Sequence, residues 1–343
     1  MYNGIEVDML NLGNADAILV TRWELGTPTR ILIDGGDACD GPTVRGFLKC
    51  RGITYLDHIV CSHPHNDHAA GLVEVVNDDT ITIGQAWMHL PWQHVDFGKL
   101  ADALNRSQTT AKRVVQIVRA SVQVSRDLLG AFAQRGLTPQ EPFNPNTIGF
   151  LTVCGPTEKY YTELLQEFAD LDRLRAIEES LASKEEDDRL DEILETTSFG
   201  SRMAETEELG GAPTAPENNS STILATVVDG NKYLFTSDAG VPALTAAANA
   251  YNIAGLHWMQ APHHGSRRNL NKDLIAHFAP KRVFISAAGT RKHPRKRLVN
   301  ALKEAGALVY STHYPKPQNI WHHAGNVPSR PDYSTLPALY DAD

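Results

Sequence analysis

Cysteine is scarce in this chain, and long apolar runs are missing. Only 4 of the 343 residues are cysteines, at positions 39, 50, 61 and 154, and no pair has CxxC spacing. This argues against a disulfide scaffold or a cysteine-bound zinc knot, so the four are expected to be packing residues. No apolar segment approaches the ~20 residues that span a bilayer, and the first residues lack the basic and apolar regions of a signal peptide. We therefore expect a cytoplasmic protein with no membrane partner.

The composition is that of a folded soluble protein, with 42% hydrophobic and 21% charged residues. The net charge of −9 argues weakly against nucleic-acid binding, but the charge is uneven along the chain. Acidic residues dominate from Glu158 to Glu217, whereas lysine and arginine dominate from Pro262 to Lys316. The basic stretch is compatible with a phosphate-bearing substrate; a merely solvated helix face is the alternative.

The densest chemistry lies between Ser62 and His68, where the sequence SHPHNDH follows the apolar run at 59–61. Neutral imidazole and carboxylate are ligands that zinc, manganese and iron accept. A strand that leads into a tight loop lets side chains two positions apart converge, while the last pair reaches a neighbouring point. One loop is therefore predicted to supply two adjacent metals. The alternative is a polar loop that merely contains many histidines.

The order HxHxDH resembles the signature of the metallo-β-lactamase superfamily. Residues 11–17 and 31–36 resemble the opening β-hairpin and the first-motif aspartate of that superfamily. Three later segments, 218–221, 233–239 and 261–266, resemble the soluble domain of the DNA-uptake channel protein ComEC and its free-standing relatives. The chain departs from that pattern where GNAD replaces the start of a glycine-rich GQGDA, and where Ser237 replaces a glycine.

The resemblance implies an α/β fold, a four-layer αββα metallo-β-lactamase sandwich. We expect a single domain over 1–343 with helical insertions at about 97–147 and 157–217. The residue pattern agrees with this. It predicts hairpin strands within 5–34, a strand at 58–61 and a helix at 69–77. Residues 97–135 have the apolar spacing of one or two long helices, and residues 207–219 form a loop that is a lid, a partner surface or disordered. The second half alternates strands (150–156, 221–228, 232–236, 282–286 and 308–310) with helices (243–251, 272–278 and 295–305).

The resemblance also implies a ligand set for two divalent ions, zinc or manganese. His63 and His65 would bind the first metal, Asp67 and His68 the second, Asp238 would bridge both, and His263 would complete the second site. The superfamily's third histidine for the first metal is missing, because the expected position carries Cys154, Gly155 and Pro156. Cys154 is a possible ligand, although a buried packing role is favoured. A first site short of one ligand would be solvent-rich and weak, which favours manganese or exchangeable zinc.

Two metals about 3.5–4 Å apart can share a water, lower its pKa and offset charge on a phosphoryl oxygen. Asp67 would orient the resulting hydroxide, and Asp34 would hold a ligand histidine from behind. The remaining predicted roles concern the substrate. His264 and Ser266 would stabilise an oxyanion, Arg267, Arg268 and Lys292 would extend the substrate surface, and His293 would protonate the leaving group unless it is an exposed histidine at a helix cap. His89, His94, His322 and His323 are weaker candidates for metal or substrate contacts.

The sequence thus predicts a metal-dependent phosphodiester hydrolase, in the first instance a nuclease that acts on DNA or RNA. One alternative is a hydrolase of a small substrate such as a cyclic nucleotide, lactone or thioester. Another is a partner-regulated subunit that binds another protein through the two insertions and is active only on assembly.

Overall fold

The computed structural model describes residues 1–94, 123–168, 208–211, 213–290, 292–333 and 337–339. Much of each predicted insertion, residues 97–122 and 169–207, lies outside the described residues, so the division into one domain with two insertions stays a prediction. Within the described part of the chain, no helix is both long and apolar enough to cross a membrane.

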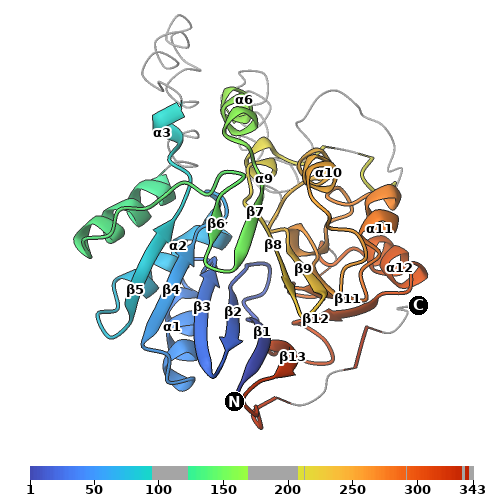
Figure 1. Cartoon of the computed structure of the whole chain (residues 1–343). Coiled ribbons are helices and arrows are strands. Elements are labelled where there is room, and N and C mark those ends of the chain that lie inside the picture. The colour runs from blue at the N-terminus through green and yellow to red at the C-terminus, as the bar shows by residue number, and fades with distance from the viewer. Residues whose placement is uncertain (95–122, 169–207, 212, 291, 334–336, 340–343) are drawn as a thin grey trace, which may run out of the picture.

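Two sheets form the body of the molecule (Figure 1). The first has the strand order β13-β1-β2-β3-β4-β5. Its strands are β1 (Asn3–Met9), β2 (Ile18–Glu24), β3 (Thr27–Ile33), β4 (Tyr55–Val60), β5 (Thr82–Trp87) and β13 (Ile320–Asn326). The second has the order β12-β11-β10-β9-β8-β7-β6. Its strands are β6 (Thr147–Ile148), β7 (Leu151–Gly155), β8 (Ile223–Val228), β9 (Asn231–Phe235), β10 (Trp258–Gln260), β11 (Arg282–Ile285) and β12 (Leu308–Ser311).

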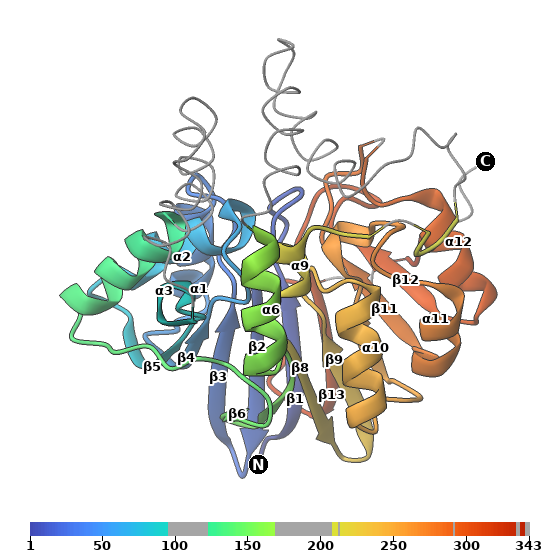
Figure 2. The ribbon, with the colours of Figure 1, turned by 90° about the horizontal axis from the view of Figure 1, so that it is seen from above.

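The two sheets pack face to face, and helices cover their outer faces (Figure 2). Apolar side chains from both sheets share one buried cluster, which includes Val7, Ile18, Leu224 and Phe235. A second cluster joins the first sheet to helices α1 (Gly41–Cys50), α2 (Asn66–Val76) and residues 123–134. A third joins the second sheet to α10 (Val241–Ala250), α11 (Lys272–Phe278) and α12 (Lys296–Glu304). The predicted four-layer αββα sandwich is confirmed.

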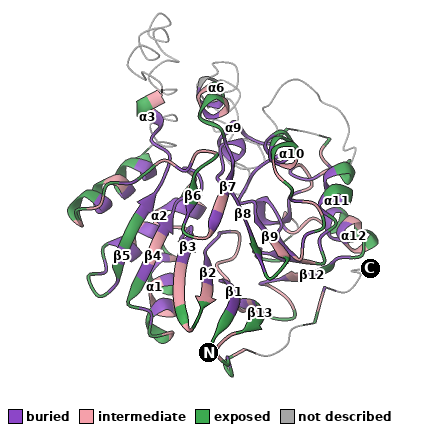
Figure 3. Ribbon diagram, in the orientation of Figure 1, coloured by how far each residue is buried: buried purple, intermediate pink, exposed green. Residues whose placement is uncertain are grey.

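Burial follows these layers, with the inner strands buried and the outward helix faces exposed (Figure 3). A strand that is buried on both faces has apolar residues at consecutive positions, whereas a half-exposed strand alternates apolar and polar residues. Residues 59–61 and 223–225 have this pattern, and the sequence predicts a strand at each place. Neither β10 nor β13 is predicted by the sequence pattern, because β10 is only three residues long and β13 carries two histidines and a glycine.

Strand β13 is a long-range addition to the first sheet. It pairs antiparallel with β1, from Asn3 opposite Asn326 to Met9 opposite Ile320. It places the ring of His322 in the inter-sheet core near Tyr233 and Phe284, whereas His323 stacks on Trp321. His322 is thus buried in the core, whereas His323 is exposed.

Strand ends and the start of α2 meet at one edge of the sandwich. Strands β3 and β4 are parallel, and their carboxyl ends lead to Asp34 and to the histidine loop. Helix α2 lies against the turn after β3, since Gly35 N donates to His68 O at 2.8 Å and Gly71 N donates to Gly36 O at 2.8 Å. This close approach of backbone to backbone fixes the histidine loop against the aspartate.

We expect Gly71→Ala to destabilise the fold by about 3 kcal/mol, the upper range for an overpacked site. A Cβ at Gly71 would overlap the carbonyl oxygen of Gly35 and lie 2.8 Å from that of Asp37. The matched control is Gly46→Ala in α1, where no atom lies within 4 Å of the added Cβ. That change should be neutral or stabilise the protein by roughly 0.5–1 kcal/mol. Urea unfolding of both variants tests this, and equal stabilities would contradict the close approach.

Candidate metal centre

The histidine loop runs from the end of β4 at Val60 to the start of α2 at Asn66. His63 projects from the loop, His65 is the N-cap residue of α2, and Asp67 and His68 lie in its first turn. A carboxylate in the first turn is favourable because it faces the positive end of the helix dipole. The loop and the helix start therefore present all four side chains of the motif at one edge.

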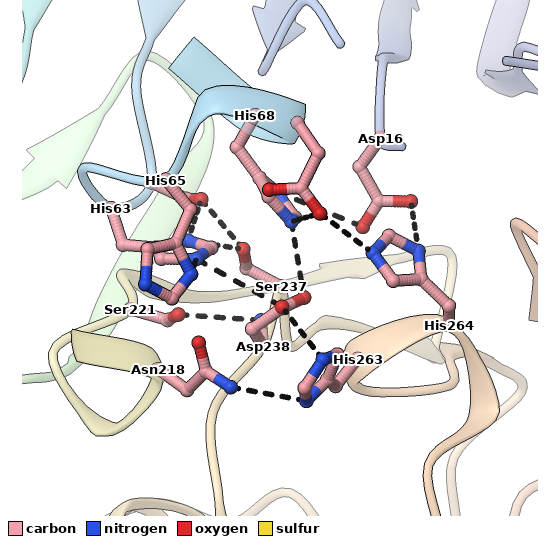
Figure 4. A network of polar contacts seen from close by, with 12 residues as sticks. Asp16, His63, His65, His68, Asn218, Ser221, Ser237, Asp238, His263 and His264 are labelled. Carbon is pink, nitrogen blue, oxygen red and sulfur yellow. Dashed lines mark hydrogen bonds and ion pairs between the residues drawn. The ribbon is translucent and has the colours of Figure 1, made fainter. Parts of the chain in front are cut away.

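A first group of ligand atoms consists of His63, His68 and Asp238 (Figure 4). His63 Nε2 lies 3.9 Å from Asp238 Oδ2, and His68 Nε2 lies 3.3 Å from Asp238 Oδ1. All three residues are buried, and their ligand atoms lie within 4.8 Å of one another. Asp238 follows β9, so this group joins the two sheets.

A second group consists of Asp67, His68 and His264. His264 Nε2 lies 3.4 Å from Asp67 Oδ2, and His68 Nε2 lies 3.9 Å from the same oxygen. His68 belongs to both groups, which are therefore adjacent. It enters both through Nε2, whose single lone pair can bind only one ion, so the groups are two overlapping places for a divalent ion.

The chemistry of the atoms fits metal binding. His68 Nε2 and Asp238 Oδ1 are buried and, although 3.3 Å apart, make no hydrogen bond with any described residue. On the far side of the ring, His68 Nδ1 contacts Asp34 Oδ2 at 2.9 Å, and His264 Nδ1 contacts the carbonyl oxygen of Ser286 at 3.1 Å. Both acceptors fix the proton on Nδ1 and leave Nε2 as the ligand atom. Residues of both groups could thus hold a metal.

The electrostatics point the same way. Burial opposes the charged form of His68, but the carboxylates of Asp238 and Asp67 outweigh it and hold the pKa of His68 well above its usual value. Burial likewise opposes ionised Asp238, yet the imidazoles of His68 and His263 hold the pKa of Asp238 well below its usual value. The pKa of His264 is raised to about 9, since Asp16 and Asp67 outweigh its burial. The buried carboxylates require positive charge nearby, which protonated His68 and His264 supply here. Divalent cations would displace the protons of these imidazoles and supply the charge instead.

Two buried aspartates, Asp34 and Asp16, support the ligands from behind. Asp34 accepts from Ser62 N at 2.8 Å and Ser62 Oγ at 2.7 Å in addition to His68. Asp16 accepts from Gln260 Nε2 at 2.7 Å, and its other oxygen lies 3.8 Å from His264 Nδ1. Burial raises the pKa of Asp16 to about 6. The sequence analysis gave no role to Asp16, although it lies within one of the motifs that carry the resemblance.

Two predicted ligands lie beside the groups rather than in them. His65 Nδ1 is 3.1 Å from His63 Nε2, at the more open side of the loop. His263 Nε2 is 3.8 Å from Asp238 Oδ2, and His263 Nδ1 contacts the amide nitrogen of Asn218 at 3.0 Å. The ligand roles of both histidines stay predictions.

The predicted acid His293 lies next to the centre. Its ring centroid is 5.4 Å from that of His263 and 5.9 Å from that of His264. It is only 3% exposed, so it is not an exposed histidine at a helix cap. Neither ring nitrogen makes a hydrogen bond with the described residues.

The predicted substrate residues flank the same turn. Ser266 is buried, and its Oγ accepts from Arg268 N at 3.3 Å. Arg267 and Arg268 are half-buried in the segment that follows, and Lys292 is half-buried immediately before His293. These side chains place positive charge on the segments around the centre.

The weaker candidates lie elsewhere. Cys154 is buried in the core beneath the second sheet and belongs to neither ligand group. His89 stacks on Tyr161 with ring centroids 4.4 Å apart, and His94 contacts Glu141 at 2.9 Å. Among the described residues, the rings that contact them are those of Phe143 and Tyr161.

No protein-family model matches the chain, and no curated protein matches it in sequence. Among solved structures, the chain is similar to one described as a new diphosphatase from the PhnP family, with a TM-score of 0.43 and 10% sequence identity. That similarity covers 95% of this chain and 100% of the other. A similarity at this level does not indicate an activity for this protein.

We expect Asp34→Asn to lower the affinity for divalent metal by about 10–100-fold. An amide cannot accept from both Ser62 N and His68 Nδ1, so one of these hydrogen bonds is lost. Asn tolerates the left-handed backbone at this position, where φ is 61°. Calorimetric titration of metal-free protein with zinc or manganese measures the change. Asp127→Asn, at an exposed position in the helix 123–134, is the matched control. Unchanged affinity in Asp34→Asn would show that the carboxylate does not support His68.

Proposed function

We propose that this protein is a metal-dependent hydrolase of phosphodiesters, with a metallo-β-lactamase-type centre that holds two divalent ions. The observation that carries the proposal is the pair of adjacent, overlapping ligand groups. His63 and Asp238 would hold one ion, Asp67 and His264 would hold a second, and the single Nε2 lone pair of His68 would bind one of the two. His65 and His263 lie beside these groups and would complete them.

Divalent metals at such a centre supply a water of lowered pKa and offset negative charge on the group under attack. The chain's own residues provide the rest. Asp67, at the rim of the centre and 29% exposed in its side chain, is placed to accept a hydrogen bond from an attacking water and so orient it. His293 lies beside His263 and His264. Burial and these two imidazoles hold the pKa of His293 well below its usual value, so its neutral ring would donate a hydrogen bond to a leaving oxygen instead of carrying a positive charge.

A phosphodiester is favoured as the substrate because basic side chains gather on the segments that enclose the centre. Arg267 and Arg268 follow His263 and His264 in the chain, and Lys292 immediately precedes His293. Positive charge beside a metal pair suits a substrate that keeps its negative charge throughout the reaction. A lactone or thioester is neutral and gains nothing from these side chains. A nuclease that acts on DNA or RNA is therefore the first candidate, and a small phosphodiester such as a cyclic nucleotide is the second.

The metal-loaded protein should cleave a phosphodiester, and the double variant His65→Ala, Asp67→Ala should lose at least about 10²-fold of that activity. The substrates are circular and end-labelled DNA and RNA together with bis(p-nitrophenyl) phosphate, each with manganese, magnesium or zinc. Cleavage of circular DNA or RNA would identify internal cutting. Cleavage of the small diester alone would identify the second candidate.

The matched control is His277→Ala, Asp127→Ala, which removes one histidine and one aspartate at exposed positions. It should retain full activity. Bound metal with no cleavage of any phosphodiester would contradict the proposal and favour a subunit that is active only with a partner.

A further inference from the structure

A buried glutamine, Gln260, joins two parts of the centre through its side-chain amide. It is the last residue of β10 and is 2% exposed. Its Oε1 accepts from Thr236 N at 3.1 Å and from Ser237 N at 3.0 Å. Backbone N–H groups can only donate, so these two bonds fix the orientation of the amide. The Nε2 group is therefore the end that donates to Asp16 Oδ2, at 2.7 Å.

The oxygen end of the amide holds the turn that leads to Asp238. The pairing of β9 with β10 ends one residue before Gln260. Residues 236 and 237, which follow β9, are buried. A buried N–H group that lacks an acceptor is costly, and here the side chain of Gln260 supplies the acceptor for both. The turn is thereby held immediately before the aspartate.

The nitrogen end of the amide holds Asp16, in the loop between β1 and β2. The N–H of Asp16 donates to Asp67 O at 3.0 Å, and its carbonyl oxygen accepts from Gly36 N at 2.9 Å. Its carboxylate lies beside His264, with Oδ1 3.8 Å from Nδ1 of that ring (Figure 4). Gln260 thus connects the turn before Asp238 with the residues of the second ligand group.

The hydroxyl contact between the sheets makes a different connection. Ser237 Oγ lies 2.6 Å from Ser62 Oγ, and Ser62 directly precedes His63. This contact relates Asp238 to His63, a member of its own ligand group. Gln260 instead relates Asp238 to members of the other group.

We infer that Gln260 is a positioning residue that sets the separation of the two ligand groups. It acts through Asp16 on the first sheet and through the turn before Asp238 on the second. Two ions share a water only when they lie about 3.5–4 Å apart, so a change in this separation acts on the pair of ions together. The inference rests on the proposed function, because it requires an ion at each group.

A side chain shorter by one methylene tests the connection. In Gln260→Asn the amide can reach the turn or Asp16, but not both. Electron paramagnetic resonance of full-length protein with two equivalents of manganese distinguishes an exchange-coupled pair from isolated ions. We expect the coupled signal in the wild type and in the control Gln134→Asn, at an exposed position in the helix 123–134. Gln260→Asn should show isolated ions, and calorimetric titration should show the second equivalent bound about 10–100-fold more weakly.

A double variant restores the connection with its polarity reversed. In Asp16→Asn, Gln260→Glu, the carboxylate at position 260 can accept from Thr236 N, from Ser237 N and from the new amide at position 16. It keeps these buried donors and acceptors paired, so it also serves as the test if Gln260→Asn does not fold. The coupled signal should be present in this variant. A coupled pair in Gln260→Asn, or isolated ions in the double variant, would overturn the inference.

These outcomes separate the two proposals. A coupled pair that persists in Gln260→Asn refutes only the role of Gln260. A wild type that binds no divalent metal, or only a single ion, refutes the two-ion centre of the proposed function, and the inference fails with it.

Discussion

The centre depends on the buried carboxylate of Asp34. It lies just after β3 in a left-handed conformation and holds two residues of the histidine loop, Ser62 through its backbone and hydroxyl and His68 through Nδ1. Ser62 Oγ also contacts Ser237 Oγ at 2.6 Å, which carries the network across to the second sheet. One aspartate thus fixes the histidine loop, the proton on His68 Nδ1 and the relation of the two sheets at the edge that carries the candidate metal centre.

Around this network, charge balance decides what the site can hold. Asp16, Asp67 and Asp238 are carboxylates gathered around His68 and His264, and water is largely excluded from two of them. Buried charge is tolerated only when it is paired. Without metal, protonated imidazoles serve as the partners; with divalent ions, the imidazoles become neutral ligands. The same carboxylate and imidazole atoms are paired with metal and without it, so the centre can keep its structure in both states.

What could be predicted from the sequence was local. The loop from Ser62 to His68 contains its ligands within seven residues, and apolar runs specify buried strands with little outside help. Long-range pairing could not be predicted in this way. Strand β13 finds β1 across more than 300 residues of sequence, with no signal in its own composition. Likewise, adjacent His263 and His264 look equivalent in sequence, and only the groups that reach their Nδ1 atoms from Asn218 and Ser286 distinguish them.

That distinction follows from backbone geometry. In regular helix or strand, two consecutive side chains diverge and would not serve one centre. The left-handed turn at His263 and His264 instead keeps both rings beside the carboxylates, with centroids 5.7 Å apart. The left-handed turn is thus the physical reason that two consecutive imidazoles can lie beside the same carboxylates.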